Sequence, residues 1–335
     1  MREILDRQRA KPKGRLYAGI RWGGAALFTA VFVALLAMLA REASAALGHM
    51  GLSILWTGWN PAKGQFGAGV FILGTLLTTL VALVIALPVG LGTATLLSEL
   101  APRWIAAPLS VLVEFLAAIP SIVVGLWGLM VLTPAFANHV EPFLKRVPVL
   151  RTLFHGPPLG ASILLAGVVL AIMILPTIVA LSRVALSGVA LADREAGLAL
   201  AATRWQVARK VVIPGARRGI RASITLAMGR ALGEAIAVAM VIGNNTAIPH
   251  SLLSPGATLG SAIVNSFSEA NPGTLERSGV VALVVVLLAI SVLINAGGQF
   301  LLRARKPSVP PRGPVDGGSL SSIPGVRHSP AGSAS

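Results

Sequence analysis

The chain has 335 residues, of which 55% are hydrophobic and 12% charged, and its formal net charge is +16. The mean hydropathy of +0.80 is higher than that of a soluble protein, which needs apolar residues only for its core. This value indicates a polytopic membrane protein. The absence of cysteine excludes a disulfide framework, a thiolate metal site and a cysteine nucleophile. The basic residues show no aromatic interleaving, so we expect no nucleic acid partner.

The apolar runs predict an all-α polytopic membrane protein with six transmembrane helices. A basic tail at 1–21 comes first, although a cleaved signal peptide is an alternative because Ala43-Ser44-Ala45 resembles a processing site. The predicted spans are about 22–40, 70–97, 105–132, 162–182, 220–242 and 279–302. Outer loops are expected at 41–69, 133–159 and 243–277, and the tail at 303–335 is predicted to be disordered because it is rich in Pro, Gly and Ser.

The distribution of Lys and Arg predicts the orientation. With the N-terminus inside, the inner segments hold 21 of the 28 basic residues and the outer segments 6, while Arg230 lies within a span. This excess indicates that both termini are cytoplasmic and that the multi-pass chain lies in a lipid bilayer. The polar loop at 183–217 then also faces the cytoplasm.

Within that loop, the stretch from Asp193 to Pro214 predicts two short helices. Asp193 is a plausible N-cap of the first, and Thr203 with Gln206 fits a capping box that begins the second. The small residues Ala201-Ala202 separate them, and Pro214 is expected to stop the second helix. Trp205, Ala208 and Val212 would lie along one side. From spacing alone, an ordinary amphipathic loop is the competing interpretation.

The same stretch resembles the EAA signature of ABC-importer permeases, which reads Glu-Ala-Ala, three residues, Gly, nine residues, Ile-x-Leu-Pro. Glu195, Ala196 and Pro214 match it outright. Conservative departures occupy the other positions, namely Gly197, Ala201, Val211 and Ile213. The departure at Ala201 matters most, because a left-handed turn there would strain a residue that has a Cβ.

ATP hydrolysis is expected on a separate chain, because no Gly-x-x-x-x-Gly-Lys-Ser/Thr motif occurs here. Glu195 could meet a basic residue of an ATPase, and Trp205 offers an aromatic anchor. The predicted coupling residues are Glu195, Ala196, Gly197, Ala201, Trp205 and Pro214. The five histidines show no ligand spacing, so we expect no metal, no catalytic residue and no cofactor bound by this chain.

A second candidate site is formed by charges within the predicted spans. Arg230 and Glu234 are spaced as neighbours on one helical face, about 15 and 21 Å into the fifth span, and Glu114 lies at similar depth in the third. They could pair and lock helices together, or Arg230 could supply a positive charge along the route of an anion. Ser121 and Asn244 could donate hydrogen bonds to an oxyanion, or could be ordinary helix-end residues.

Three further stretches resemble permeases of the PstC type from the bacterial phosphate importer: SILWTGWNP at 53–61, EFLAAIPSIVVGLWG at 114–128 and GRALGEAIAVAMVIGN at 229–244. This resemblance covers roughly residues 50–302 and implies the type I ABC-importer permease architecture in the bacterial inner membrane. It also implies alternating access, a homologous PstA-type permease, an ATPase dimer that carries ATP and Mg, and a periplasmic phosphate-binding protein. The AMVIGN ending favours PstC over PstA.

Other functions remain open from the sequence. The same machine could carry another oxyanion, such as sulfate or molybdate. An ATP-independent anion channel or carrier could also use the Arg230 and Glu234 charges, although it would not need the loop at 183–217. A membrane-embedded enzyme is disfavoured because no paired Asp, His or Ser constellation lies within the spans.

Overall fold

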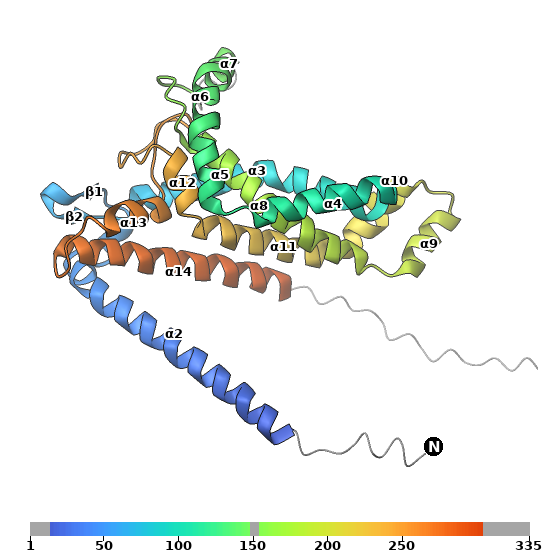
Figure 1. Ribbon diagram of the computed structural model, residues 1–335, viewed down its shortest axis with the longest axis horizontal. Helices are drawn as coiled ribbons and strands as arrows, with labels where there is room; N and C mark the ends of the chain where they lie inside the picture. Colours follow the sequence, from blue (N-terminus) through green and yellow to red (C-terminus); the bar gives the residue numbers. More distant parts are fainter. Residues whose placement is uncertain (1–13, 148–153, 304–335) are drawn as a thin grey trace, which may run out of the picture.

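The computed structural model describes residues 14–147 and 154–303 and is an elongated bundle of helices (Figure 1). The long helices are α2 (Gly14–Met50), α3 (Gly69–Thr95), α4 (Arg103–Ala118), α8 (Ile163–Ser187), α11 (Ile213–Gly233) and α14 (Leu275–Arg303). The shorter ones are α5 (Ser121–Trp127), α6 (Thr133–Ala135), α7 (Glu141–Arg146), α9 (Leu191–Ala199), α10 (Arg204–Val207), α12 (Ile236–Val241) and α13 (Leu259–Phe267). π-Helical turns extend several of them: η3 (Leu96–Leu100), η4 (Gly128–Leu132), η5 (Phe136–Val140) and η7 (Ala208–Val212).

Five helical stretches of the described residues are long and apolar enough to cross a membrane. They are Gly19–Leu55, Gly69–Leu100, Ser121–Arg146, Ile163–Ser187 and Leu275–Phe300. The chain is therefore an all-α polytopic protein. Two of the predicted spans, 105–132 and 220–242, are not single helices in the structure, because each is divided by a break.

The first break lies at Ile119-Pro120, between α4 and α5. Pro120 disfavours the helical conformation of the residue before it, and Ile119 is extended at φ −67°, ψ 126°. Helix α5 begins immediately afterwards, where the amides of Val123 and Val124 donate to the Pro120 carbonyl oxygen. The third predicted span therefore becomes two helices that meet at a corner.

The second break follows Gly233, the last residue of α11. Glu234 is extended at φ −76°, ψ 110°, and α12 begins at Ile236. Helix α13 packs directly on this break, since a Cβ at Gly260 would lie 3.0 Å from the Ala235 Cα and 3.3 Å from the Glu234 carbonyl oxygen. The break is therefore supported by close backbone packing.

Helix α8 is the centre of the bundle and contributes the largest share of its buried apolar residues, including Leu170, Ile174 and Ile178. It packs closely against α3 because a Cβ at Gly90 would lie 2.7 Å from Ile178 and one at Gly167 would lie 2.4 Å from Val81. Small residues at such contacts let helix backbones approach in a membrane.

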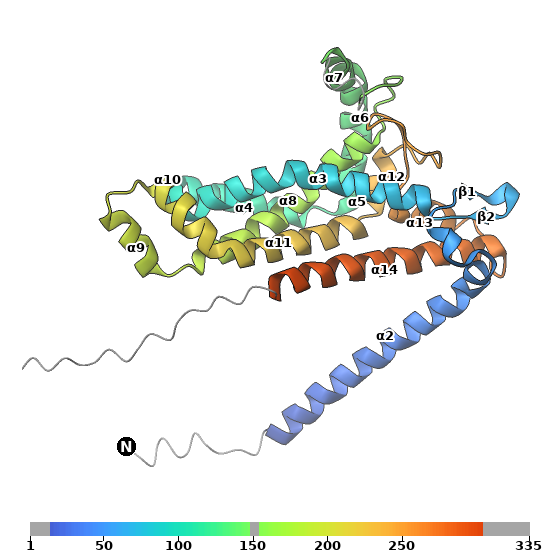
Figure 2. The ribbon, with the colours of Figure 1, turned by 180° about the vertical axis from the view of Figure 1, so that it is seen from behind.

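A two-stranded hairpin of β1 (Trp59–Asn60) and β2 (Gln65–Phe66) occupies one end of the bundle, while α9 and α10 form the opposite end (Figure 2). The 3-10 turns η1 (Gly51–Leu55) and η2 (Pro61–Lys63) flank β1. The ring of Trp59 packs at 5.3 Å from that of Phe66 and 5.5 Å from that of Phe71. These ring contacts hold the hairpin against the start of α3.

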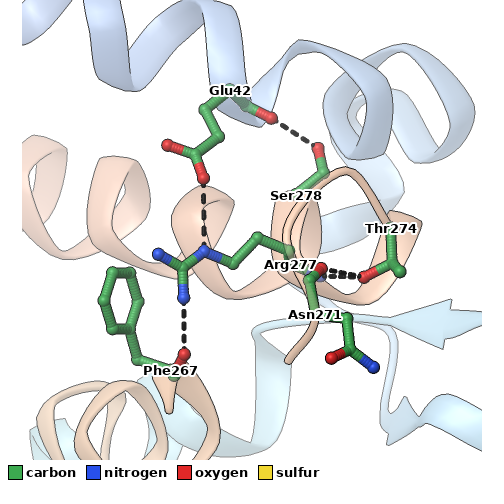
Figure 3. A network of polar contacts seen from close by, with 6 residues as sticks. All are labelled: Glu42, Phe267, Asn271, Thr274, Arg277 and Ser278. Atoms are coloured by element: carbon green, nitrogen blue, oxygen red, sulfur yellow. Dashed lines mark hydrogen bonds and ion pairs between the residues drawn. The ribbon is translucent and has the colours of Figure 1, made fainter. Parts of the chain in front are cut away.

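Helix α2 meets the bundle only near its C-terminal end, and its first part diverges from α14 (Figure 1). Arg277 Nε lies 3.2 Å from Glu42 Oε1, and the Arg277 guanidinium lies 3.4 Å from the centre of the Phe267 ring (Figure 3). Ser278 Oγ donates to the Glu42 carbonyl oxygen and accepts from the Ala46 amide. These polar contacts join α2 to the start of α14.

All three expected outer loops contain helix in part, and the loop at 243–277 contains α13 and the start of α14. Helix α2 continues through residues 41–50, and helical turns continue through 133–146. Helix α2 also includes residues 14–21 of the predicted basic tail. Prolines did not end the helix at 133–146, because the π-turns η4 and η5 precede Pro134 and Pro142. The rest of the first tail, 1–13, and the predicted disordered tail at 304–335 lie outside the described residues.

Candidate functional site

Helices α9 and α10 form a projection at one end of the bundle, joined by a turn at residues 200–203 (Figure 2). No residue of α9 is buried. The predicted N-cap was wrong: Ala190 occupies that position, and Asp193 lies in the first turn of the helix. A carboxylate in the first turn still favours the helix, because it faces the positive end of the helix dipole.

The capping box of α10 is confirmed. The backbone amide of Gln206 donates to Thr203 Oγ1 at 3.3 Å, and the backbone amide of Thr203 donates to Gln206 Oε1 at 2.9 Å. The preceding turn contains Ala201 with φ 57°, in the left-handed region. The expected strain at this departure from the glycine of the signature is therefore present.

The prediction that Pro214 stops the second helix was wrong. α10, η7 and α11 form one continuous helical rod, with Pro214 in the first turn of α11. The Ile213 amide donates to the Ala208 carbonyl oxygen five residues earlier, which defines a π-turn. The wider turn accommodates the missing proline hydrogen and the bulk of its ring.

The predicted face of Trp205, Ala208 and Val212 is divided between solvent and core. Trp205 is 52% exposed, whereas Ala208 and Val212 are buried, Val212 in a cluster with Leu97 and other residues of α3 and α8. Widening at η7 changes the helical periodicity, so residues that a regular helix would align point in different directions. Glu195 and Ala196 are exposed on α9, and Gly197 is half-buried.

A pair of charges that was not predicted from the sequence holds α9 to the bundle. Arg194 Nη2 lies 3.2 Å from Glu99 Oε1 at the end of α3 and donates to the Leu186 carbonyl oxygen of α8 at 2.7 Å. Gly197 supplies the other close contact, since its Cβ position lies 3.1 Å from Val207. The only signal in the sequence is one acidic residue in the short turn and one basic residue beside the EAA glutamate.

The charges predicted within the spans are not brought together as expected. Because α11 ends at Gly233, Arg230 and Glu234 do not share one helical face. Arg230 is exposed in the last turn of α11, Glu234 is half-buried at the break, and Glu114 is exposed on α4. The ion pairs of the described residues include none of these three.

Ser121 and Asn244 lie at helix ends. Ser121 is half-buried as the first residue of α5, directly after the break at Pro120. Asn244 has a left-handed φ of 51°, and its side-chain amide donates to the Ala239 carbonyl oxygen at 2.7 Å. Asn244 thus closes the C-terminal end of α12, which is a structural role.

The two breaks are close in space because α5 packs on α12. A Cβ at Gly125 would lie 2.8 Å from the Ala237 Cα, and one at Gly128 would lie 3.0 Å from Val241. The contacts advance in the same direction along both helices, so α5 and α12 run parallel. Ser121 and Glu234 therefore lie at the corresponding ends of two packed helices.

At the hairpin end, a cavity of about 540 Å³ lies between the hairpin and the loop that follows α12. Trp56, Trp59 and Asn60 line one side, and Thr246 and Ile248 line the other. The cavity has both polar and apolar lining residues, and it lies at the end of the bundle opposite α9.

Comparison with known proteins identifies the family. Residues 86–306 match the family described as binding-protein-dependent transport system inner membrane component. The phosphate transport system permease protein PstC of Xylella fastidiosa (strain Temecula1) is 40% identical over 78% of this chain and 82% of its own length. PstC of Haemophilus influenzae is 41% identical over 73% of this chain and 78% of its own length.

Solved structures agree on the fold. A chain of a bacterial alginate ABC transporter, in complex with an alginate-bound periplasmic protein, has a TM-score of 0.55 at 14% identity and covers 86% of this chain and 97% of its own. A chain of the inward-facing MetNI methionine ABC transporter has a TM-score of 0.50 at 21% identity and covers 72% and 95%. The chain belongs to the binding-protein-dependent transport system inner membrane components and, among them, to the PstC permease family.

Proposed function

We propose that this chain is a permease subunit of an ATP-driven importer and carries inorganic phosphate across the bacterial inner membrane by alternating access. The observation that carries the proposal is 40% identity to a phosphate permease over most of both chains. The permease itself catalyses no reaction, and ATP with Mg acts on a separate ATPase dimer.

The ATPase docks on α9 and α10. Exposed Glu195 meets a basic residue of the ATPase, and half-exposed Trp205 inserts as an aromatic anchor. Ala196, Gly197, Ala201 and Pro214 shape the same coupling surface. The absence of buried residues along α9 supports this role, because the side of the helix that carries Glu195 and Ala196 is exposed and open to a partner.

The chain crosses the membrane six times, with both termini, 1–21 and 303–335, in the cytoplasm and 22–302 forming the permease domain. Two features support this orientation: the excess of Lys and Arg in the inner segments and the course of α2 and α14, which join the hairpin end and extend toward the α9 side (Figure 2). A PstA-type permease completes the pathway, and a phosphate-binding protein docks at the hairpin end from the periplasm.

Phosphate passes near the two helix breaks. Ser121 and Glu234 lie at these breaks, while Arg230, exposed one turn earlier on α11, supplies positive charge to the route. Glu114 and Asn244 border the path from α4 and from the end of α12. The exposed position of Arg230 supports this assignment over an internal ion pair, because its charge is left available in this chain.

Uptake of radiolabelled phosphate tests the function in membrane vesicles that contain the whole complex, with the binding protein outside and ATP present or absent inside. Uptake that needs both, persists with an uncoupler and disappears in Glu195→Arg supports an importer driven through α9. Uptake that ignores ATP, or that persists in Glu195→Arg, contradicts the docking proposal and favours a channel or carrier. Radiolabelled sulfate and molybdate in the same vesicles identify another oxyanion as cargo.

A further inference from the structure

We propose that Arg194 is the residue that transmits movement of α9 to the membrane-spanning bundle. The inference rests on the proposed docking of an ATPase at α9 and α10. It assigns a positioning role to Arg194 and Glu99, which belong to neither the EAA positions nor the proposed ion path. Arg194 lies beside Glu195, but its side chain points to the bundle and contacts Glu99 and Leu186.

Helix α9 has few other attachments. It contains no buried residue, and besides Arg194 its close contact is Gly197 against Val207 of α10. α10 and η7, by contrast, are anchored by apolar packing of Val207 and Val212 with the ends of α3 and α8. A force applied to α9 therefore reaches the bundle through the chain on either side of it, residues 188–190 and the turn to α10, and through the side chain of Arg194.

Arg194 joins α9 to the ends of two different helices. Its guanidinium lies 3.2 Å from Glu99 in η3, which extends α3, and donates at 2.7 Å to the Leu186 carbonyl near the end of α8. The Glu99 side chain is 10% exposed and that of Arg194 is 22% exposed. Both side chains are largely buried, so water screens their charges less than it screens a surface pair. Glu99 Oε1 has no hydrogen-bond partner among the described residues, so charge holds this pair, and the hydrogen bond to the Leu186 carbonyl oxygen orients the guanidinium.

The two helices it reaches form the tightest pair in the bundle. α3 and α8 approach closely at Gly90 and Gly167, so they move as one unit. At the far end of α3, Thr75 Oγ1 accepts from the Leu259 amide at the start of α13. α13 in turn packs through Gly260 on the break at Glu234 and Ala235.

A contiguous series of contacts thus runs from α9 through Arg194, α3 and α13 to the break that lies on the proposed ion path. A continuous series of contacts carries movement only if both of its ends respond to it, so the test separates transport from ATP hydrolysis. The contacts of Arg194 with Glu99 and Leu186 are called the tether below. When the tether is lost, we expect the ATPase still to dock and hydrolyse ATP, while the bundle no longer moves with α9.

The test uses the assembled complex in proteoliposomes, with the binding protein supplied and both phosphate uptake and ATP hydrolysis measured. In Arg194→Gln we expect hydrolysis to persist while uptake per ATP falls by roughly tenfold, which corresponds to a loss of about 1.4 kcal/mol in coupling free energy. Arg217→Gln is the matched control, since it removes an exposed arginine of α11 that forms no ion pair with the described residues.

A second readout does not depend on cargo. The chain has no cysteine, so spin labels can be placed on it only at introduced residues, for which exposed Ala199 on α9 and Leu96 at the end of α3 are suitable. We expect one narrow distance distribution in the native complex and in Arg217→Gln, and a broad one in Arg194→Gln. If the native complex takes up no phosphate, the proposed cargo is wrong, yet these distances still test the tether.

Three results would overturn the inference: native uptake per ATP in Arg194→Gln, an unchanged distance distribution, or a proportional loss of hydrolysis and uptake, which would assign Arg194 to docking. If Arg194→Gln fails to assemble, Arg194→Lys replaces it. Lysine keeps the charge but lacks the planar fork that reaches both partners, so reduced uptake per ATP is expected. Native coupling in assembled Arg194→Lys would then count against the tether.

Discussion

Ala201 and Asn244 have positive φ angles of 57° and 51°, and they do so for different reasons. Asn244 tolerates the left-handed region, and its side chain also bonds to the Ala239 carbonyl, so the residue type suits the position. Ala201 has no such compensation. It occupies the position where the EAA signature has glycine, so the turn between α9 and α10 keeps its conformation at the expense of strain.

Replacing Ala201 with glycine is expected to stabilise the protein. A left-handed alanine costs about 1 kcal/mol that glycine avoids, although glycine also loses more backbone entropy on folding, so the net gain is below that amount. The measurement is the thermal unfolding midpoint of the detergent-purified chain.

Ala202→Gly is the matched control for this change, because Ala202 is adjacent and its φ is not positive. It should leave the midpoint unchanged or lower it. A lower midpoint for Ala201→Gly than for Ala202→Gly would show that Ala201 is not strained.

At the scale of helices, several prolines lie within continuous helical segments, although proline usually interrupts a helix. The π-turns η3, η4, η5 and η7 are each closed by a bond from the residue directly before a proline to a carbonyl five residues earlier. Three of these prolines, Pro134, Pro142 and Pro214, lie in the first turn of the next helix, which continues without interruption. A widened turn removes the clash between the proline ring and the carbonyl four residues back, so the helix bends or shifts rather than ends.

Both helix breaks adjoin the close contact between α5 and α12, and Gly125 provides the test of that contact. Gly125→Ala should lower the thermal midpoint, because the new Cβ would lie 2.8 Å from the Ala237 Cα and 2.8 Å from Met240 Sδ, which overpacks the α5 and α12 contact by about 1–3 kcal/mol. Phosphate uptake should fall with it, since both breaks adjoin this contact.

Gly92→Ala is the control with the opposite expected sign. Gly92 is an exposed residue within α3 and its Cβ position has no atom within 4 Å. Alanine there should stabilise the helix by about 0.5–1 kcal/mol. Equal effects of the two substitutions would contradict the packing account of the α5 and α12 contact.

At the scale of the whole molecule, the bundle has two distinct ends. The hairpin, the cavity lined by Trp56 and Thr246, and the Arg277 contacts lie at one end, and α9 with α10 lies at the other. The distribution of charge matches this division, because many of the basic residues lie in the segment that contains α9 and in its flanks. An importer needs such a difference, since different partners act on its two sides.

Single cysteines test the orientation directly, because the natural chain has none. Lys63→Cys at the hairpin and Ala192→Cys on α9 are both at exposed positions. In intact cells, an impermeant maleimide should label Lys63→Cys and spare Ala192→Cys, while inside-out vesicles should give the reverse. Labelling of Ala192→Cys from outside would overturn the proposed topology.

The class and the family could be predicted from the sequence alone, and so could the position of the two short helices α9 and α10. Apolar run length identifies membrane-spanning segments almost regardless of packing, because a bilayer demands about 20 apolar residues per helix. The capping box of Thr203 and Gln206 was also predictable, since its contacts lie within four residues. Local signals of this kind do not depend on distant parts of the chain.

Three features could not be predicted from the sequence: where helices break, which face of a helix is buried and which charges meet. The break after Gly233 is supported by Gly260, and the Arg194 contact joins residues 95 positions apart at Glu99. Arg230 and Glu234 matched a helical pair in sequence, yet the break separates them. Such features depend on the free energy of contacts between distant segments, which periodicity and spacing along one segment do not contain.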